Sequence, residues 1–420
     1  MSSHVSPDQP SRCRSRLPMP TTLKTPPATA KPKRPESASW LQRIACVSTS
    51  RADAGIFQPL LRALSANDQW TISCLVGGTH HDESFGCTGT AFERLSNVEL
   101  FDVKHFAQGD SPTQVARSTG QAVTEFSRAL AASQCDLVFV LGDRPEMLAV
   151  ALAATIHRIP IAHLHGGDST HGAIDDACRH AITKLAHLHF PALSEHAERI
   201  LHMGEEPWRI HTVGALALDD LARFKPSPVD AVSREIGLDL SQPTLVLAYH
   251  PETLCDLPPD RQINQVLGGL HAWKGNVLVL GPNADVGHDA VNSALQDFAS
   301  LRPDTVLKAS LSQELFWNCL YNATALVGNS SAGIIESSSF RIPVVNIGDR
   351  QQGRIHADNV LHAAIERDEI ADILAAALDP MFRESFPRLK NPYGDGHAAE
   401  RILVAMKTIP SKNELIIKNN

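Results

Sequence analysis

The sequence contains no apolar run that approaches the roughly 20 residues needed to cross a bilayer, which argues against an integral membrane protein. Its 420 residues carry 38 Lys and Arg against 46 Asp and Glu, and the net charge of −8 argues against a protein that binds nucleic acid through counterion release. The glycine pattern G-x-G-x-x-G and the P-loop pattern G-x-x-x-x-G-K-[ST] are also missing. The sequence therefore supports neither a nicotinamide cofactor nor a P-loop nucleotidase.

Cysteine pairs are missing as well, because none of the eight cysteines forms a C-x-x-C motif. Several of them sit inside apolar runs, as Cys46 does in RIACVST. Scattered cysteines in a long chain without an apolar secretion signal are typical of reduced, buried thiols, so the sequence predicts a cytoplasmic protein. The eight are Cys13, Cys46, Cys74, Cys87, Cys135, Cys178, Cys255 and Cys319.

Residues 1–40 differ in composition from the rest of the chain. They hold seven Lys and Arg against two acidic residues, a charge of +5 that leaves −13 on the remainder, and they contain eight of the 27 prolines. Low hydrophobicity combined with net charge cannot compensate the entropy of ordering, so we expect a disordered basic tail. A targeting peptide and a later translation start, for example at Met19, are the alternatives.

From residue 41 onward, short apolar runs alternate with longer amphipathic segments. Short runs rich in β-branched residues are typical of buried strands, and their alternation with helices predicts βαβ units and a parallel sheet. The first half contains predicted strands at 43–48, 70–76, 136–142, 160–165 and 210–214, with helices at 55–66, 111–133, 145–157, 175–186 and 194–203. The second half contains predicted strands at 243–251, 276–282, 305–308, 323–331 and 342–348.

A proline-rich stretch, RFKPSPVD at 223–230, separates the two series and indicates a linker. We therefore expect an α/β fold of two Rossmann-type, doubly wound parallel-sheet domains, at 41–222 and 231–395, followed by a helix and tail at 396–420. The amphipathic helix at 397–407 could dock on either domain. Ligands of open parallel sheets bind beyond the carboxyl ends of the strands, so the site should lie in the cleft between the domains.

The first candidate site residues follow a very apolar strand in LVFVLGDRPEM. Asp143, Arg144 and Glu146 come directly after it, and three charges at such a position are costly unless they are exposed or used. Arg51, at the turn after the first strand of the chain, could meet an anionic ligand, although a solvated arginine explains it equally well. These positions are where a ligand of the first domain would be bound.

The next strand leads into a dense polar stretch, AHLHGGDSTHGAIDDACRHAITK at 162–184. In a helix over 175–186, Asp175 and Arg179 would share a face. Several carboxylates near a cleft suit proton transfer, because neighbouring charges push their pKa values apart; the alternative is an ordinary ion pair beside a polar loop. No HExxH or other familiar zinc spacing is present, so no metal is predicted and most histidines are expected to serve in hydrogen bonds. The titratable residues of the stretch are His163, His165, Asp168, His171, Asp175, Asp176, Arg179 and His180.

Candidate residues of the second domain also follow strands. His250, in AYHPET, comes after the first of them and would point into the cleft. In GNSSAGIIESSSF the chain passes from strand to turn to helix, which places Ser330 and Ser331 where backbone N–H groups and the positive helix end can receive a diphosphate. Glu336, about one and a half turns into that helix, could accept hydrogen bonds from ribose hydroxyls.

Two arginines complete this set. Arg350 and Arg354 stand beside a glycine-rich turn in NIGDRQQGRIHADNV, an arrangement that suits an anionic ligand. An ordinary helix N-cap at NSS and solvated arginines are the alternative explanations. The joint placement of these residues after successive strands of one domain favours a nucleotide ligand.

Together these segments resemble the hydrolysing UDP-N-acetylglucosamine 2-epimerase family of sialic-acid-type biosynthesis. The resemblance is carried, in order from about residue 43 to 360, by STSRADAG, GDRPE, IPIAHLHGGDSTHGAIDDACRHAITKLAHLHF, AYHPET, GNSSAGIIESSSF and NIGDRQQGR followed by NV. It implies a GT-B-like fold, with two Rossmann-type domains and the active site in the cleft between them. It also implies a homo-oligomer, since family members are commonly dimers or tetramers.

The reaction that the resemblance implies needs no cofactor. UDP leaves the anomeric carbon of the nucleotide sugar while the carbon-2 proton is removed, which gives a glycal-like intermediate. Water then adds so that carbon 2 is inverted, and UDP and N-acetylmannosamine are released. The catalytic residues implied are Asp143, Asp168, Asp175 and His250, the last acting on the departing phosphate oxygen. The residues expected to contact the substrate are Arg51, Arg144, Glu146, His165, Arg179, Ser330, Ser331, Gly333, Glu336, Arg350 and Arg354.

One position departs from the family pattern. Hydrolysing members usually read HGGE where this chain reads HGGD, and His165 stands where the non-hydrolysing branch has its comparable carboxylate. Asp168 is thus one methylene shorter, and moving a carboxylate by about 1 Å can change a rate strongly. We expect Asp168, assisted by Asp143, to take the carbon-2 proton. A related substrate, such as a 2,4-diacetamido-6-deoxy sugar nucleotide, is equally compatible with the residues.

Two other functions share these features. A GT-B glycosyltransferase would have the same fold and nucleotide cradle, but it would not need the Asp168 and Asp175 cluster and should be silent on the donor alone. A non-catalytic sugar-nucleotide binder would bind UDP without turnover and would tolerate Asp143→Asn. Candidate acids, a histidine and arginines that all follow strands facing one cleft favour the enzyme.

Overall fold

The computed structural model of the protein describes residues 40–82, 85, 88–92, 97–105, 109–384 and 386–419, so the expectations for residues 1–39 lie outside the described part. Within that part, no helix combines the length and the apolar character that crossing a membrane requires. The described cysteines are free, and four of the six are buried while Cys178 and Cys255 are partly exposed. The prediction of reduced thiols therefore agrees with the structure for these six.

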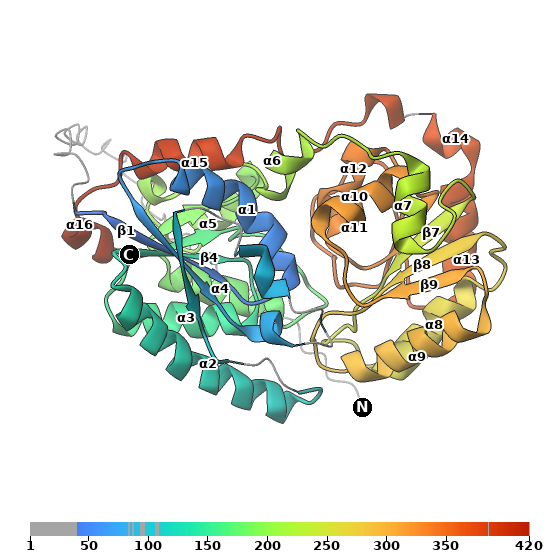
Figure 1. Ribbon diagram of the computed structural model, residues 1–420, viewed down its shortest axis with the longest axis horizontal. Helices are drawn as coiled ribbons and strands as arrows, with labels where there is room; N and C mark the ends of the chain where they lie inside the picture. The colour runs from blue at the N-terminus through green and yellow to red at the C-terminus, as the bar shows by residue number, and fades with distance from the viewer. Residues whose placement is uncertain are drawn as a thin grey trace, which may run out of the picture. The chain divides into compact units, whose positions relative to one another are not determined.

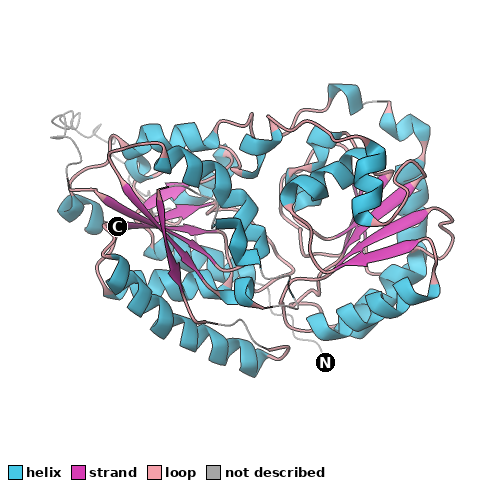
Figure 2. Cartoon of the chain, in the orientation of Figure 1, coloured by secondary structure: helices cyan, strands magenta, loops and turns pink. Residues whose placement is uncertain are grey.

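Two six-stranded sheets, each covered by helices on both faces, make up the described fold (Figures 1 and 2). All neighbouring strands run parallel. The first sheet contains β1 (Arg43–Ser48), β2 (Thr71–Val76), β3 (Val98–Asp102), β4 (Leu137–Leu141), β5 (Ile161–Leu164) and β6 (Leu188–Phe190). The second contains β7 (Thr244–Ala248), β8 (Asn276–Leu280), β9 (Thr305–Lys308), β10 (Ala325–Gly328), β11 (Val344–Ile347) and β12 (Val360–Ala363). The predicted GT-B-like class is confirmed.

The helices alternate with these strands along the chain. Those of the first half are α1 (Arg51–Ser65), α2 (Pro112–Ser133), α3 (Pro145–Ile156), α4 (Asp175–Leu185), α5 (Ser194–His202) and α6 (Ala217–Leu221). Those of the second half are α7 (Val229–Ile236), α8 (Pro259–Gly269), α9 (His288–Leu301), α10 (Gln313–Asn322), α11 (Ala332–Ile335), α12 (Ser337–Phe340), α13 (Arg367–Leu378) and α14 (Pro380–Arg383). The chain closes with α15 (Ala398–Met406) and α16 (Lys412–Ile416).

The strand order of each sheet reverses near its centre. The first sheet has the order β3-β2-β1-β4-β5-β6 and the second has β12-β11-β10-β7-β8-β9. The reversals therefore lie between β1 and β4 and between β7 and β10, where loops diverge at the carboxyl ends of the strands and leave room for a ligand. The loops concerned begin at Thr49, Gly142, Tyr249 and Asn329.

Both faces of each sheet are buried, which explains the continuous apolar runs in the sequence. In β1, Ile44 and Cys46 point into a core shared with α1, while Ala45 and Val47 point into a second core shared with α2 and α3. The second sheet repeats this arrangement, with α7 and α10 on one face and α8, α9 and α13 on the other. Complete burial of a large aliphatic side chain contributes about 1.5–3 kcal/mol, so these cores fix the strand ends that carry the site.

Several expectations for individual elements were wrong. The predicted strand at 210–214 joins the sheet through a single bridge from Ile210 to His189, because β6 is short and the chain turns away at Gly214, whose φ is +93°. The strands β3 and β12 were missed, since they lie at sheet edges and keep partly exposed, mixed sequences. The helix predicted after β10 is broken into α11 and α12 at Glu336.

The helix predicted at 397–407 docks on the first half of the chain. Ala398, Ile402 and Met406 of α15 belong to the same core as α1 and β1, and Figure 1 shows α15 beside α1. The N-terminus of α15 is held by Asp219, whose carboxylate accepts the N–H groups of Ala398 and Ala399 at 2.8 and 2.7 Å. The chain thus returns from the second sheet to close on the first.

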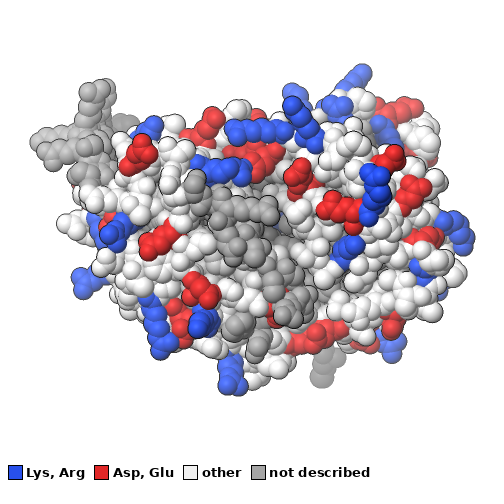
Figure 3. Space-filling view, in the orientation of Figure 1, with Lys and Arg blue, Asp and Glu red and all other residues white. Residues whose placement is uncertain are grey.

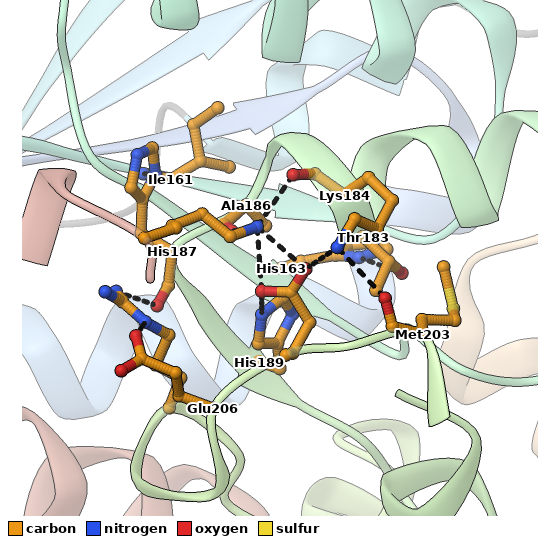
Figure 4. Close-up of polar contacts among 12 residues, drawn as sticks. Ile161, His163, Thr183, Lys184, Ala186, His187, His189, Met203 and Glu206 are labelled. Atoms are coloured by element: carbon orange, nitrogen blue, oxygen red, sulfur yellow. Dashed lines mark hydrogen bonds and ion pairs between the residues drawn. The ribbon is translucent and has the colours of Figure 1, made fainter. Parts of the chain in front are cut away.

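The end of the chain is anchored by a buried network of ion pairs (Figure 4). Glu205, whose side chain is fully buried, lies 2.7 Å from the ammonium groups of both Lys184 and Lys418 and 3.2 Å from Nε2 of His189. Arg209 donates to two carbonyl oxygens of the C-terminal segment at 2.7 and 2.6 Å. Burial alone would raise the pKa of Glu205, but these hydrogen bonds outweigh it and lower the pKa to about 2.

Glu205→Gln is expected to lower the free energy of unfolding at neutral pH by about 1–3 kcal/mol, because the largely buried ammonium of Lys418 and the partly exposed ammonium of Lys184 lose their counter-charge. A carboxyl whose folded pKa is depressed contributes stability above its unfolded pKa, and that contribution fades as pH falls toward about 2. Urea denaturation should therefore show a gap between variant and wild type at pH 7 that closes in acid. Glu198→Gln, at an exposed position of α5, is the control, and equal stabilities at pH 7 would contradict the assignment.

Charges of both signs are interspersed over the described surface seen in Figure 3, rather than gathered into one basic area. A protein that binds nucleic acid through its phosphates needs clustered Lys and Arg on one face. The view in Figure 3 thus agrees with the inference from net charge on the face that it displays.

Candidate active site

A pocket opens where loops of the first sheet face loops of the second. Arg144, Glu146 and Asp175, all expected at the site, line one side of it. Thr253 and Asp285 line the other side. Its remaining lining residues are Gly109, Val115, Ser118, Pro145, Ile174, Ala284 and Val286. Residues that follow strands of both sheets thus meet around one concave space, as the strand-end argument requires.

Asp143 is held by a buried arginine. It follows β4, and its carboxylate accepts a short hydrogen bond from Arg179, whose side chain is 1% exposed. Arg179 also donates to Asp176 and to Thr170, each at 3.0 Å. Burial alone would raise the pKa of Asp143, but the charges of Arg179 and Arg354 outweigh it and hold the pKa below its usual value. Asp143 is therefore an ionised carboxylate at neutral pH.

Arg179 does not pair with Asp175, contrary to the spacing argument. Although the two residues lie four positions apart on α4, the guanidinium turns to Asp176 and across to Asp143. Asp175 is the first residue of the helix and faces the pocket instead. Burial, together with the negative charges of Asp143 and Asp285, raises the pKa of Asp175 to about 7. Asp175 can thus both accept and release a proton near neutral pH.

Asp285 joins the two halves at the pocket and was not anticipated. It lies in the loop after β8, 3.2 Å from Arg350 and 3.7 Å from Arg144 of the other half. Arg350 in turn lies 3.8 Å from Asp175. Burial would raise the pKa of Asp285, but Arg350 and Arg144 outweigh it and lower the pKa. Two arginines from different sheets therefore converge within reach of the same carboxylates.

Asp168, the expected base, is fully committed to ion pairs. One carboxylate oxygen lies 3.0 Å from Nε of Arg354, and the other lies 3.1 Å from Nε2 of His196. Burial would raise the pKa of Asp168, but Arg354 and His196 lower it far below its usual value. A carboxylate held in this way is a poor proton acceptor.

The histidines of the 162–189 stretch act in hydrogen bonds. His163 contacts the carbonyl oxygen of Gly142 at 2.8 Å and Thr183 at 3.2 Å, and burial lowers its pKa to about 3. His165 has a left-handed backbone, with φ of +60°, and its Nε2 accepts the N–H of Leu216 at 3.3 Å. Burial lowers the pKa of His165 to about 4, so both rings are neutral donors or acceptors.

His250 is locked in one orientation by amide groups. Its backbone N–H and C=O both bond to the side chain of Asn329, at 2.8 and 2.9 Å. Its Nδ1 accepts the backbone N–H of Asn283 at 3.0 Å, so the neutral ring carries its proton on Nε2. Only 6% of His250 is exposed, so the residue is more buried than expected for a side chain that points into the cleft. The Nε2–H group of His250 is therefore a hydrogen-bond donor whose direction is fixed by these contacts.

The expected nucleotide residues lie in the second half. Ser331 is the exposed N-cap residue of α11, but this helix has only four residues and offers a weaker dipole than the predicted longer helix. Glu336, at the break that follows, accepts a hydrogen bond from Trp317 at 2.8 Å. Burial raises the pKa of Glu336 to about 7. Ser330 bonds to Ala332 N–H at 3.4 Å, and Gly333 packs against β11.

Arg51 begins α1, one residue after the cap, and its side chain lies outside the described atoms. The sequence argument missed three residues that position the expected ones. Thr170 accepts a hydrogen bond from Arg179, and His196 pairs with Asp168. Asp285 pairs with Arg350. Asp285 could have been found, because it lies in the loop at the carboxyl end of β8, as Asp143 lies in the loop at the carboxyl end of β4.

This fold and this site define a GT-B-like α/β enzyme in which carboxylates of the first half face arginines of the second half. A sequence model of the UDP-N-acetylglucosamine 2-epimerase family matches residues 62–407, and the chain belongs to that family. It is 33% identical, over 90% of its length and 99% of the relative, to the UDP-N,N'-diacetylbacillosamine 2-epimerase (hydrolyzing) of Legionella pneumophila. It is 30% identical to a GDP/UDP-N,N'-diacetylbacillosamine 2-epimerase (hydrolyzing) of Campylobacter jejuni, over 77% of this chain and 85% of that one.

Solved structures show the same fold. The UDP-GlcNAc 2-epimerase of Neisseria meningitidis, bound to UDP-GlcNAc, superposes with a TM-score of 0.73 at 17% identity, over 87% of this chain and 99% of that one. The MnaA protein of S. aureus, solved with UDP, superposes with a TM-score of 0.70 at 18% identity, over 86% and 95%. At these identities the likeness concerns the fold.

Proposed function

We propose that the protein is a hydrolysing 2-epimerase. Its substrate is UDP-N-acetylglucosamine or a related UDP-2-acetamido sugar such as the 2,4-diacetamido-6-deoxy form, and its products are UDP and the free 2-epimeric sugar. The observation that carries the proposal is the meeting of Asp175, Arg144 and Asp285 at one pocket, where Arg350 lies 3.8 Å from Asp175 and 3.2 Å from Asp285. The negative charge of Asp143 helps to raise the pKa of Asp175 there. Two relatives named for hydrolysing epimerases of diacetamido sugars support the reaction class. A relative of Escherichia coli named polysialic acid biosynthesis protein P7, 29% identical over 89% of this chain and 96% of that one, supports a place in sialic-acid-type biosynthesis.

Asp175 takes the carbon-2 proton in this proposal. A general base works best when its pKa lies near the working pH, and the pKa of Asp175 is raised to about 7. The electron pair of the C2–H bond forms the C1=C2 double bond, and the C1–O pair leaves with UDP. Asp143 remains ionised beside Arg179 and keeps the pKa of Asp175 high. Asp168, which the sequence favoured as the base, orients Arg354 instead.

In this proposal His250, Arg144 and Arg350 stabilise the departing UDP. The Nε2–H of His250 donates to the departing phosphate oxygen, and Arg144 and Arg350 offset the charge that develops there. Water then adds at carbon 1, and a solvent-derived proton reaches carbon 2 from the opposite face, which inverts that centre. The overall change consumes one water and leaves no group on the enzyme.

The second half holds the nucleotide. We assign the diphosphate to the turn at Ser330, Ser331 and Gly333, and the ribose hydroxyls to Glu336, which burial and Trp317 hold in place. Residues 231–395 then form the nucleotide domain and residues 41–222 the catalytic domain, and the stretch 223–230 serves as the hinge between them. No cofactor takes part in the proposed reaction.

Turnover of a nucleotide sugar without any acceptor distinguishes a hydrolysing epimerase from a glycosyltransferase and from a binding protein. The purified protein is incubated with UDP-N-acetylglucosamine and with the diacetamido nucleotide sugar, and UDP release and free sugar are followed without any acceptor. We expect release of UDP and of one free epimer from at least one substrate. A GT-B glycosyltransferase would be near-silent, and a binding protein would bind UDP without turnover; either result would remove the proposal.

Asp285→Asn is expected to move the acidic limb of the kcat/KM profile to lower pH by about half a pH unit. Asp285 is one of the negative neighbours that raise the pKa of Asp175, and a base with a lower pKa keeps its active, deprotonated form further into acid. The pH–rate profile of the variant is compared with those of wild type and of Asp289→Asn, an exposed position on α9. An unmoved limb in Asp285→Asn would argue against Asp175 as the base.

We also propose a cytoplasmic homo-oligomer. The free cysteines suit a reducing compartment. Leu152 and Ile156, one turn apart on α3, are 43% and 68% exposed, and adjacent exposed apolar side chains suit an interface between copies. Light scattering should give two or four times the 45.5 kDa of one chain, and Leu152→Asp should lower that mass. A monomer at micromolar concentration would contradict the oligomer.

A further inference from the structure

Glu252 is a buried carboxylate whose backbone is fixed on both sides. It follows β7 two residues after His250 and is 5% exposed. The side chain of Gln262, on α8, accepts the N–H of Glu252 at 2.9 Å and donates to its C=O at 3.2 Å. Tyr249 donates to the same Gln262 oxygen at 3.0 Å. The direction of the Glu252 side chain is therefore set by the body of the second half.

The carboxylate reaches the loop after β11. One oxygen, Oε1, accepts the backbone N–H of Arg350 at 2.9 Å. Gly348 lies against the same oxygen, in a left-handed conformation with φ of +75°, and a Cβ at this position would come within 2.2 Å of Oε1. The 348–350 loop is thus shaped around the carboxylate. Burial raises the pKa of Glu252, while the hydrogen bond from Arg350 N–H lowers it in part.

The other end of Arg350 lies at the reaction centre. Its guanidinium is 3.2 Å from Asp285 and 3.8 Å from Asp175, and its side chain is 11% exposed. The neighbouring Gln351 donates to the backbone of Asn329 at 2.8 Å. Asn329 is the residue that clamps His250, so the loops that carry the histidine and the arginine share one buried scaffold.

We propose that Glu252 is a positioning residue of the active site, which holds the backbone of Arg350 so that its guanidinium meets the developing phosphate charge beside Asp175. The inference rests on the proposed function of that pocket. A buried carboxylate is costly unless hydrogen-bond donors satisfy it, and here the donor is the backbone of a residue of the site. Glu252 acts only through Arg350, and this dependence makes the inference testable.

A double-mutant cycle provides the test. Glu252→Ala, Arg350→Ala and the double variant are compared by kcat and KM on the accepted nucleotide sugar and by UDP affinity from calorimetry. We expect Glu252→Ala to lower kcat/KM by about 10- to 100-fold in the wild-type background, but by less than about 3-fold when Arg350 is already Ala. Glu252→Gln keeps one carbonyl acceptor and should lose less than about 5-fold. An equal loss in both backgrounds would overturn the proposal, as would an unaffected Glu252→Ala.

Glu369→Ala is the matched control. Its carboxylate accepts the N–H of Ala364 at 3.0 Å in the same half, so the same kind of contact is deleted at an exposed position of α13. We expect its activity to equal that of wild type. If Glu252→Ala does not fold, the cycle is run with Glu252→Gln, and a loss that Arg350→Ala does not abolish again overturns the proposal.

Failure of the proposed function would be visible separately. The wild-type protein would then release no UDP from any nucleotide sugar, whatever the state of Glu252. In that case the cycle is read from UDP affinity, where Glu252→Ala should weaken binding only while Arg350 is present. An additive loss of UDP affinity would overturn the positioning role independently of the reaction.

Discussion

Asp143→Asn is expected to lower kcat by about 10- to 100-fold while leaving the fold intact. The substitution removes the negative charge that Arg179 now balances and that helps to raise the pKa of Asp175. The base would then have a lower pKa and be less well matched to neutral pH, and the buried Arg179 would lose one of its two carboxylate partners. Steady-state kinetics over a pH range, with thermal unfolding of the same sample, measures both consequences.

Asp136→Asn is the matched control for this variant. Asp136 stands at the opposite end of β4, where its carboxylate accepts the N–H groups of Gln42 and Arg43 at 2.9 Å. The same substitution is made at the opposite end of β4, away from the residues that line the pocket, so kcat should stay unchanged even if stability falls. If Asp143→Asn turns over like wild type, Asp143 takes no part in the reaction; if it unfolds, Asp143 is structural.

His250→Ala is expected to lower kcat by about a hundredfold or more with a smaller effect on KM. Asn329 fixes the backbone of His250, and the backbone N–H of Asn283 donates to Nδ1 of its imidazole, so the Nε2–H is the donor assigned to the departing phosphate oxygen. A donor used only as charge develops supports the transition state rather than substrate binding, so the loss should appear in kcat. UDP affinity, measured by calorimetry, should change little.

His271→Ala provides the comparison for that variant, since His271 is an exposed histidine between α8 and β8 in the same half. We expect wild-type kinetics from it. A His250→Ala protein that loses UDP affinity and keeps kcat would show that the histidine serves the ground state. A loss of folded protein in His250→Ala, detected by circular dichroism, would instead assign the ring to the core.

Much of the fold could be predicted because strands buried on both faces have unmistakable sequences. Every residue of β4, LVFVL, is buried, and so is every residue of β7, TLVLA. The edge strands β3 and β12 escaped prediction because one side of each lies open and tolerates polar residues. The break of the helix at Glu336 was also missed, since neither glycine nor proline stands at that position to mark it in the sequence.

The candidate site followed from the rule that ligands meet the carboxyl ends of parallel strands, which placed Asp143, Arg144 and His250 correctly in their loops. What the rule could not supply was the partner of each charge. Arg179 pairs with Asp143, 36 residues earlier, and not with its helical neighbour Asp175. That choice decides which carboxylate stays ionised and which titrates near neutrality, and it depends on distances across the fold.

The most direct test of the account is the isotope content of the product. The protein is incubated with the accepted nucleotide sugar in heavy water, and the free sugar is examined by NMR. Abstraction at carbon 2 followed by delivery of a solvent proton predicts the 2-epimeric sugar with deuterium at carbon 2 and one UDP for each sugar. A product that keeps its original proton at carbon 2, or that keeps its original configuration, would contradict the account.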